Sequence, residues 1–150
     1  WANVTTGQVY SSVIAKERGI KITESKSSTA SHYSNLIQVD VKTDKKKSGV
    51  AGTLFTREDT RIVRIDDFDV EAVPEGYILL ISNKDVPGIV GQIGTLLGDN
   101  KINIAGMTLG RDKPGGQATT LLKIDSAISD KVMQEIRKAK NILDAKLIRL

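Results

Sequence analysis

The second half of the chain switches between two hydrophobic periods in a fixed order. YILLIS at 77–82 is a compact apolar run, residues 87–99 have helical spacing, and 102–109 and 118–124 predict strands. Ser129 then precedes a second helical stretch, and ILDAKLIRL closes as a strand. Because a period of 2 indicates a strand and 3.6 a helix, the order is βαββαβ. That order predicts a ferredoxin-like domain, with two helices on one face of an antiparallel sheet. The other face or an edge stays free, which predicts self-association.

The first half has a different rhythm. Residues 9–18 predict a short helix, with Gly19 placed as a left-handed cap, and 20–24 alternate like a strand. A polar, Ser-rich loop at 25–34 precedes further predicted strands, which are IQVDV, VAGTLF, RIVRI and FDVEAV. The strand that contains Ile37, Val39 and Val41 is expected to be half-buried. Pro74-Glu75-Gly76 is typical of a linker. We therefore expect an α+β chain with two small domains, at 1–73 and 77–150.

Composition excludes several classes of function. The 150 residues contain no cysteine and one histidine, His32, which excludes disulfides and thiol chemistry and leaves no multi-histidine metal centre, so we expect no metal. No stretch reaches the roughly 18 apolar residues of a membrane span, so we expect no membrane partner. The net charge is +4, but the densest basic run, at 45–47, has no aromatic side chains interleaved for base stacking. We expect no nucleic-acid partner.

Four glycines stand within the helical stretch, although each glycine in a helix interior costs about 1 kcal/mol relative to alanine. Gly91, Gly94 and Gly98 fall on one side of the helix, and this stripe predicts close packing against a neighbouring element. Gly88 is different because it follows Pro87 at the helix start. Free backbone N–H groups there attract a carboxylate or phosphate, and Gly88 would let a ligand approach. Asp85 either caps this helix or binds an ammonium group.

Residues 77–150 resemble an ACT domain, an amino-acid-sensing module, above all in "DVPGIVGQIGTLLGDNKINIAGMTLGR" and "ILDAKLIRL". More narrowly, they resemble the ACT domain of the D-3-phosphoglycerate dehydrogenase family. "VIAKERGIKITESKSS", "GTLF" and "RIVRIDDFDVEAVPEGY" are similar to the allosteric substrate-binding domain that precedes ACT in long members. "WANVTTGQVYSS" matches poorly, so we expect the first domain to be incomplete at its N-terminus and the chain, which opens on Trp1, to be a fragment.

The resemblance implies a regulatory role in a cytoplasmic enzyme. Members of this family oxidise 3-phosphoglycerate with NAD on the way to L-serine, and L-serine bound between paired ACT domains inhibits them. The implied serine ligands are Asn83, Asp85 and Asn103, with the backbone around Pro87 and Gly88 receiving the carboxylate. The fragment itself would hold no cofactor and would catalyse nothing, because it has neither a dinucleotide fold nor a hydride-transfer site. The implied assembly is a homo-oligomer, either a dimer through ACT pairing or a tetramer.

The first domain is expected to bind an anion, either a phosphorylated substrate or phosphate. The basic groups available are Lys16 and Arg18 at the predicted helix end, with Lys26 and His32 in the Ser-rich loop. Cations near a helix C-terminus also have a purely structural explanation, because they offset the helix dipole. Both interpretations remain open for these four residues.

Three functions stay open at this stage. The chain is the regulatory part of a D-3-phosphoglycerate dehydrogenase, a subunit of an iron–sulfur L-serine dehydratase, which pairs the same domain types, or a ligand-free oligomerisation domain. KERGIKITES and EGY fit the dehydrogenase better. A ligand screen with amino acids separates the third function from the first two.

Overall fold

The computed structural model describes residues 11–27 and 32–150, and the chain divides into two compact units with a sequence boundary between positions 31 and 32. In the first unit, α1 spans Ser11–Glu17. The predicted left-handed glycine follows the helix, since Gly19 has a φ of 68° and Ile20 N–H donates to Ala15 O at 2.8 Å. Positions 9 and 10 of the predicted helix, and 28–31 of the predicted loop, lie outside the described residues.

The predicted strand at 20–24 is wrong. Residues 20–27 have no regular structure, and the side chains of Ile20 and Ile22 are 56% and 59% exposed. A strand needs a hydrogen-bonded neighbour, because a lone extended segment leaves its N–H and C=O groups unpaired. Ile20 and Ile22 therefore alternate without forming a strand, because the described part of the first unit has no neighbouring strand to pair with this segment.

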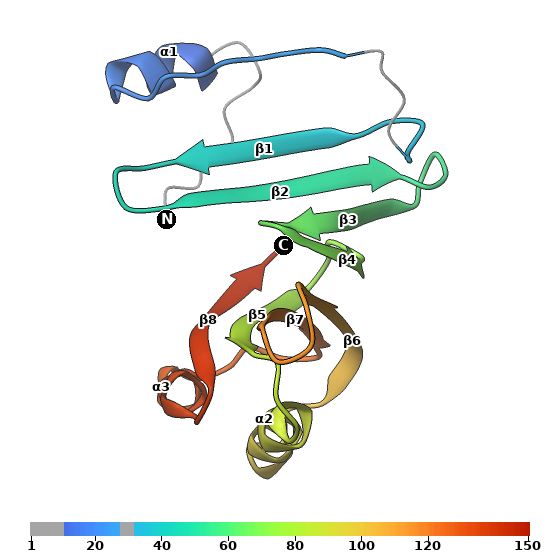
Figure 1. Cartoon of the computed structure of the whole chain (residues 1–150), viewed down its shortest axis with the longest axis vertical. Coiled ribbons are helices and arrows are strands. Elements are labelled where there is room, and N and C mark those ends of the chain that lie inside the picture. The colour runs from blue at the N-terminus through green and yellow to red at the C-terminus, as the bar shows by residue number, and fades with distance from the viewer. Residues whose placement is uncertain (1–10, 28–31) are drawn as a thin grey trace. The chain divides into compact units, whose positions relative to one another are not determined.

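The second unit begins with an antiparallel sheet in the order β1-β2-β3-β4, shown in cyan to green in Figure 1. Its strands are β1 Ile37–Lys42, β2 Lys47–Leu54, β3 Thr60–Ile65 and β4 Phe68–Ala72. These match the strands predicted from the alternating pattern. The expectation that β1 is half-buried is wrong, because all six of its residues are exposed. β1 is an edge strand. Alternating apolar and polar residues show that side chains point to opposite faces of a strand, but they do not show that another layer covers one of those faces.

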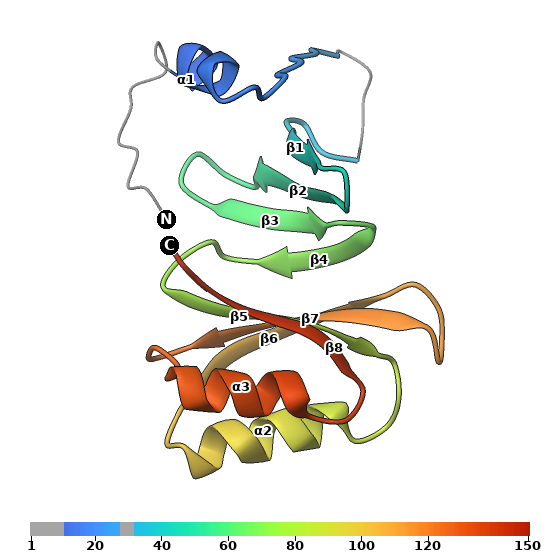
Figure 2. The same ribbon diagram turned by 90° about the vertical axis from the view of Figure 1, so that its left-hand side faces the viewer.

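The rest of the second unit is the predicted βαββαβ arrangement, and the ferredoxin-like expectation is confirmed. It comprises β5 Tyr77–Lys84, α2 Ile89–Asp99, β6 Ile104–Arg111, β7 Gln117–Ile124, α3 Asp130–Lys138 and β8 Ile142–Arg149. The strand order is β6-β7-β5-β8, so β6 and β8 are the edges. Figure 2 shows α2 and α3 side by side on one face of this sheet. Ser129 caps α3 as predicted, accepting from Val132 N–H at 3.4 Å.

Both faces of this second sheet are covered near its centre. The helix-covered face holds the main core, which includes Leu79, Ile81, Leu97, Leu122 and Ile136. On the opposite face a second cluster joins the two sheets, because Val70 of β4 packs with Ile78 and Leu121. The central strand β5 is therefore apolar toward both faces, which explains why YILLIS is a continuous apolar run and not an alternating one.

The two sheets are held together by specific contacts as well as by this cluster. Thr108 Oγ1 of β6 donates to Glu71 O of β4 at 2.6 Å. Gly110 lies so close to Phe68 and Val70 that a Cβ at position 110 would clash with β4. These contacts show that β4 covers part of the face opposite the helices. No helix in the described ranges is long and apolar enough to cross a membrane.

The predicted linker is pinned at both sides. Glu75 forms an ion pair with Lys123 of β7, and Leu150 N–H donates to Gly76 O at 3.0 Å. Through its hydrogen bond and its charge, the Lys123 ammonium holds the pKa of the Glu75 carboxyl below its ordinary value of 4.5. The segment between β4 and β5 is thus short and tied to the second sheet.

Candidate functional site

The loop that follows β5 is held in place by the buried side-chain amide of Asn83, near the end of that strand. Asn83 is only 1% exposed, and its Oδ1 accepts from Thr120 Oγ1 at 3.1 Å. Its Nδ2 donates to Lys84 O at 2.8 Å, which fixes the backbone where the loop begins. A buried amide must find such partners, because an unpaired one would cost about 1–3 kcal/mol. In this structure the buried Asn83 side chain therefore supports the loop.

Asp85 lies at the surface of the same loop, where its side chain is 20% exposed. Its Oδ2 accepts from Arg111 Nη1 at 3.2 Å and from Gly115 N–H at 3.3 Å. Its backbone N–H donates to Gly116 O at 2.9 Å. Of the two roles that the sequence left open for Asp85, capping the helix does not occur, because no side chain caps α2. Asp85 instead ties the loop after β5 to the turn between β6 and β7, and its Oδ1 has no hydrogen-bond partner among the described residues.

The start of α2 carries no side-chain cap. Gly88 is the N-cap residue with φ 94°, a left-handed conformation that favours glycine, and the helix begins at Ile89. Pro87 therefore precedes the cap, and is not in the first turn as predicted. The first backbone N–H groups of α2 are free of side-chain acceptors. They give this end of the helix its positive partial charge.

Asn103 does not join these residues within one chain. The register aligns Ile104 and Tyr77 with the same residue, Ile124, so Asn103 lies near the start of β5. Asp85 lies just beyond the other end of that strand, roughly 25 Å away at about 3.3 Å per residue. Asn103 is exposed, and its Nδ2 donates to Asp125 Oδ2 at 2.7 Å. The residues proposed for one site thus occupy opposite ends of the same sheet.

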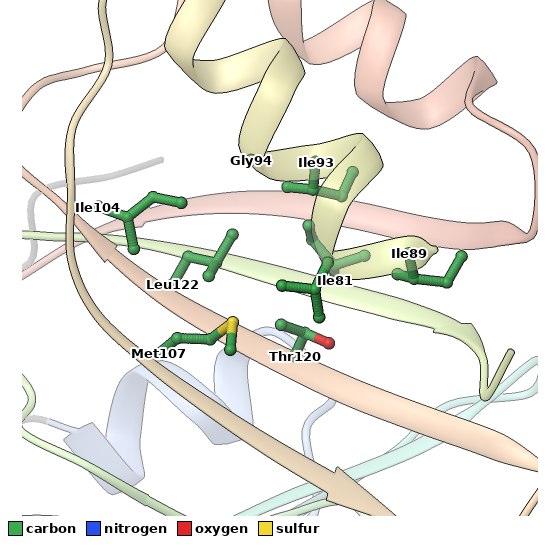
Figure 3. Close-up of a pocket in the computed structure, with 9 residues that line it drawn as sticks. Ile81, Ile89, Ile93, Gly94, Ile104, Met107, Thr120 and Leu122 are labelled. Atoms are coloured by element: carbon green, nitrogen blue, oxygen red, sulfur yellow. The ribbon is translucent and has the colours of Figure 1, made fainter. Parts of the chain in front are cut away.

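An apolar groove runs between α2 and the sheet, along the side of edge strand β6 (Figure 3). Thr120, which carries the hydrogen bond to Asn83, is its polar residue, and the other members are apolar: Ile81, Ile89, Val90, Ile93, Gly94, Ile104, Met107 and Leu122. Met107 is 50% exposed. The groove has no charged side chain, so charged groups of a ligand would have to meet the polar residues at the ends of the sheet.

Arg111 is a polar residue of this region that the sequence interpretation did not include. It ends β6 and pairs in register with Ala118, whose other neighbour is Asn83. Its side chain is 54% exposed and lies against Asp85. The signal in the sequence is GRDKPGG, a cation at a strand end directly before a glycine turn. Its partner is distant in the sequence, so the contact becomes visible only in the fold.

The four basic residues predicted for an anion site fall in different units. Lys16, Arg18 and Lys26 belong to the first unit and His32 to the second. All four are exposed, and Lys26 Nζ lies 3.4 Å from Glu24 Oε1. No group of three His, Asp or Glu side chains that would suit a metal ion occurs in residues 11–27 and 32–150.

Two family models match the chain. Residues 3–66 match the intervening domain of D-3-phosphoglycerate dehydrogenase, and residues 77–141 match the ACT domain. Both matches agree with the resemblances found in the sequence.

Curated relatives point the same way. D-3-phosphoglycerate dehydrogenase of Archaeoglobus fulgidus is 43% identical over 139 residues, which are 91% of this chain and 26% of the relative. The enzyme of Bacillus subtilis is 38% identical over 146 residues, 97% of this chain and 28% of the relative. That of Methanocaldococcus jannaschii is 36% identical over 142 residues, 95% and 27% of the two chains. The chain spans about a quarter of the length of these relatives. It therefore carries the intervening domain of the D-3-phosphoglycerate dehydrogenase family followed by an ACT domain, the two parts of that family's regulatory region.

Proposed function

We propose that this chain is the serine-sensing regulatory region of a cytoplasmic, NAD-dependent D-3-phosphoglycerate dehydrogenase. In this proposal residues 77–150 bind L-serine and transmit feedback inhibition, and residues 1–73 take a phosphorylated substrate or phosphate through Lys16, Arg18, Lys26 and His32. NAD and the catalytic residues belong to parts of the enzyme outside this chain. The match of residues 3–66 to the dehydrogenase intervening domain favours this function over the serine dehydratase alternative.

The main support for the proposal is the distance between Asp85 and Asn103. Because they lie at opposite ends of one sheet, both can contribute to one site only if two copies of the chain form it. Strand β6 is an edge, and it exposes Met107 and Leu109 at 50% and 39%. If two β6 strands pair antiparallel about a two-fold axis near Met107, Asn103 of one copy lies opposite Arg111 of the other. Arg111 contacts Asp85, so the two halves of the predicted site meet across the pair. Each dimer would then hold two equivalent sites.

The chemistry of the assembled site suits a small amino acid. The unpaired Oδ1 of Asp85 can accept from the ligand ammonium, and a charge-assisted hydrogen bond of this kind is stronger than a neutral one. The uncapped start of α2 at Gly88 favours an anionic group. Asn103 of the second copy can both donate to and accept from a hydroxyl. Asn83 holds the loop on which Asp85 is carried, since it bonds Lys84 O and Thr120.

A thermal-shift screen of the common amino acids, followed by calorimetric titration, tests the function. L-Serine should stabilise the chain by about 2.7 kcal/mol at a free concentration near 100 times its dissociation constant. D-Serine is the matched control, since it has the same groups in the wrong arrangement. If no amino acid shifts the unfolding transition and L-serine at millimolar concentration gives no heat, the chain is not a serine sensor, and the oligomerisation alternative is favoured.

A further inference from the structure

The Asp85–Arg111 ion pair is accessible to solvent, mainly through the arginine side chain. Arg111 Nη1 lies 3.2 Å from Asp85 Oδ2, yet the arginine side chain is 54% exposed. An ion pair whose arginine is this exposed contributes little to stability, because solvent screens the charges. The loop and the turn are already joined without Arg111, because Asp85 accepts from Gly115 N–H and donates its own N–H to Gly116 O. Stability alone does not account for an arginine at this position.

The pair also leaves one group of each sign available at the same place. Asp85 Oδ1 has no hydrogen-bond partner in the described part of the chain. Of the five N–H donors of a guanidinium, Arg111 uses one on Asp85, and its side chain makes no other hydrogen bond within the described ranges. An acceptor for an ammonium group therefore lies on a carboxylate that is 3.2 Å from a guanidinium, which carries several donors for a carboxylate. These are the two charged groups of a free α-amino acid.

We propose that Arg111 binds the α-carboxylate of the amino-acid ligand while Asp85 binds its ammonium, so that the pair selects zwitterions. This rests on the proposed function and assigns the carboxylate to Arg111 in place of the start of α2. The guanidinium carries a full charge and binds carboxylates through two parallel hydrogen bonds. The end of a helix offers only about half an elementary charge, and Gly88 brings no side-chain donor.

Calorimetry of L-serine and L-serinamide with wild type and Arg111→Gln tests the assignment. Serinamide keeps the ammonium and the hydroxyl but has no carboxylate. Arg111→Gln should weaken L-serine binding by roughly tenfold to a hundredfold, the range of a hydrogen bond to a charged group. The same variant should bind serinamide more tightly than wild type does, because the guanidinium no longer repels a cationic ligand or occupies Asp85. A positioning role through Asp85 alone would weaken both ligands together.

Lys113→Gln is the matched control. It removes one positive charge from the exposed turn beside Arg111, and its side chain has no ion pair among the described residues. It should change L-serine affinity by less than about twofold, as expected for a screened surface charge. An equal loss for both ligands in Arg111→Gln, or serinamide binding that is no tighter than in wild type, overturns the role of Arg111. Failure of wild type to bind L-serine overturns the proposed function as well.

Discussion

At the residue scale, the affinity for L-serine should depend on the charge of Asp85. Asp85→Ala removes the group expected to hold the ligand ammonium, a charge-assisted contact of about 1.5–3 kcal/mol, so L-serine affinity should fall roughly tenfold to more than a hundredfold. Asp85→Asn keeps the size of the side chain and its bond to Gly115, and it should lose nearly as much affinity because the charge is gone. Calorimetric titration measures both. Unchanged affinity in both variants would remove Asp85 from the site.

Individual site residues were predictable only where their neighbours are local in sequence. The left-handed glycine at Gly19 and the cap at Ser129 depend on adjacent residues, and both were predicted from the sequence. The partners of Asp85 and Asn83 are Arg111 and Thr120, which only the pairing of β5 with β7 and of β7 with β6 brings near. The burial of Asn83 had no local signal either, because a distant strand supplies its hydrogen-bond partner.

At the element scale the glycine stripe of α2 differs from the prediction. A Cβ at Gly91, Gly94 or Gly98 would meet no atom within 4 Å, so within one chain these glycines do not serve close packing. Gly91→Ala should therefore raise the free energy of unfolding by up to about 1 kcal/mol, because alanine restricts the unfolded chain and favours the helix. Chemical denaturation measures it. Gly116→Ala is the contrasting control, since a Cβ there would overlap Asp112 Oδ1. Destabilisation by Gly91→Ala would restore the packing interpretation.

The segment between β4 and β5 should give a pH dependence of stability. Lys123 holds the pKa of Glu75 below its ordinary 4.5 in the folded chain. The pair therefore contributes stability above pH 4.5 and loses it as the pH falls through the lowered pKa. Urea unfolding of wild type and Glu75→Gln should differ at neutral pH and converge in acid. Glu135→Gln, an exposed change without an ion pair in the described ranges, should show no such convergence. A Glu75→Gln effect that is constant with pH would contradict the account.

Hydrophobic period predicted the elements of the second sheet because the apolar positions of its strands and helices face one shared core. The same signal failed at Ile20 and Ile22, where no partner strand is present in the described first unit, and at β1, whose apolar residues are exposed. Period describes how side chains alternate, while strand formation and burial depend on what lies alongside. The contact of β4 with the second sheet had no local signal at all.

At the scale of the whole molecule, the edge formed by β6 should control self-association. Met107 on β6 and Leu143 on β8 are both 50% exposed, so they form a matched pair of probes for the two edges. Met107→Lys should give monomers in light scattering, because a lysine at the two-fold axis meets its own copy and is desolvated there. Leu143→Lys should leave the dimer intact. Dissociation by Leu143→Lys alone would place the interface at the other edge.

In the proposed dimer each site takes Asp85 from one copy and Asn103 from the other. Subunit exchange between Asp85→Ala and Asn103→Leu chains, followed by titration with L-serine, distinguishes a shared site from one formed within a single chain. Each variant alone should lack intact sites. After random exchange about half of the dimers are mixed, and each mixed dimer regains one intact site, so about one high-affinity site per four chains should appear. If exchange is verified by mass and no high-affinity site returns, the two residues do not meet across an interface between copies, and the account is wrong.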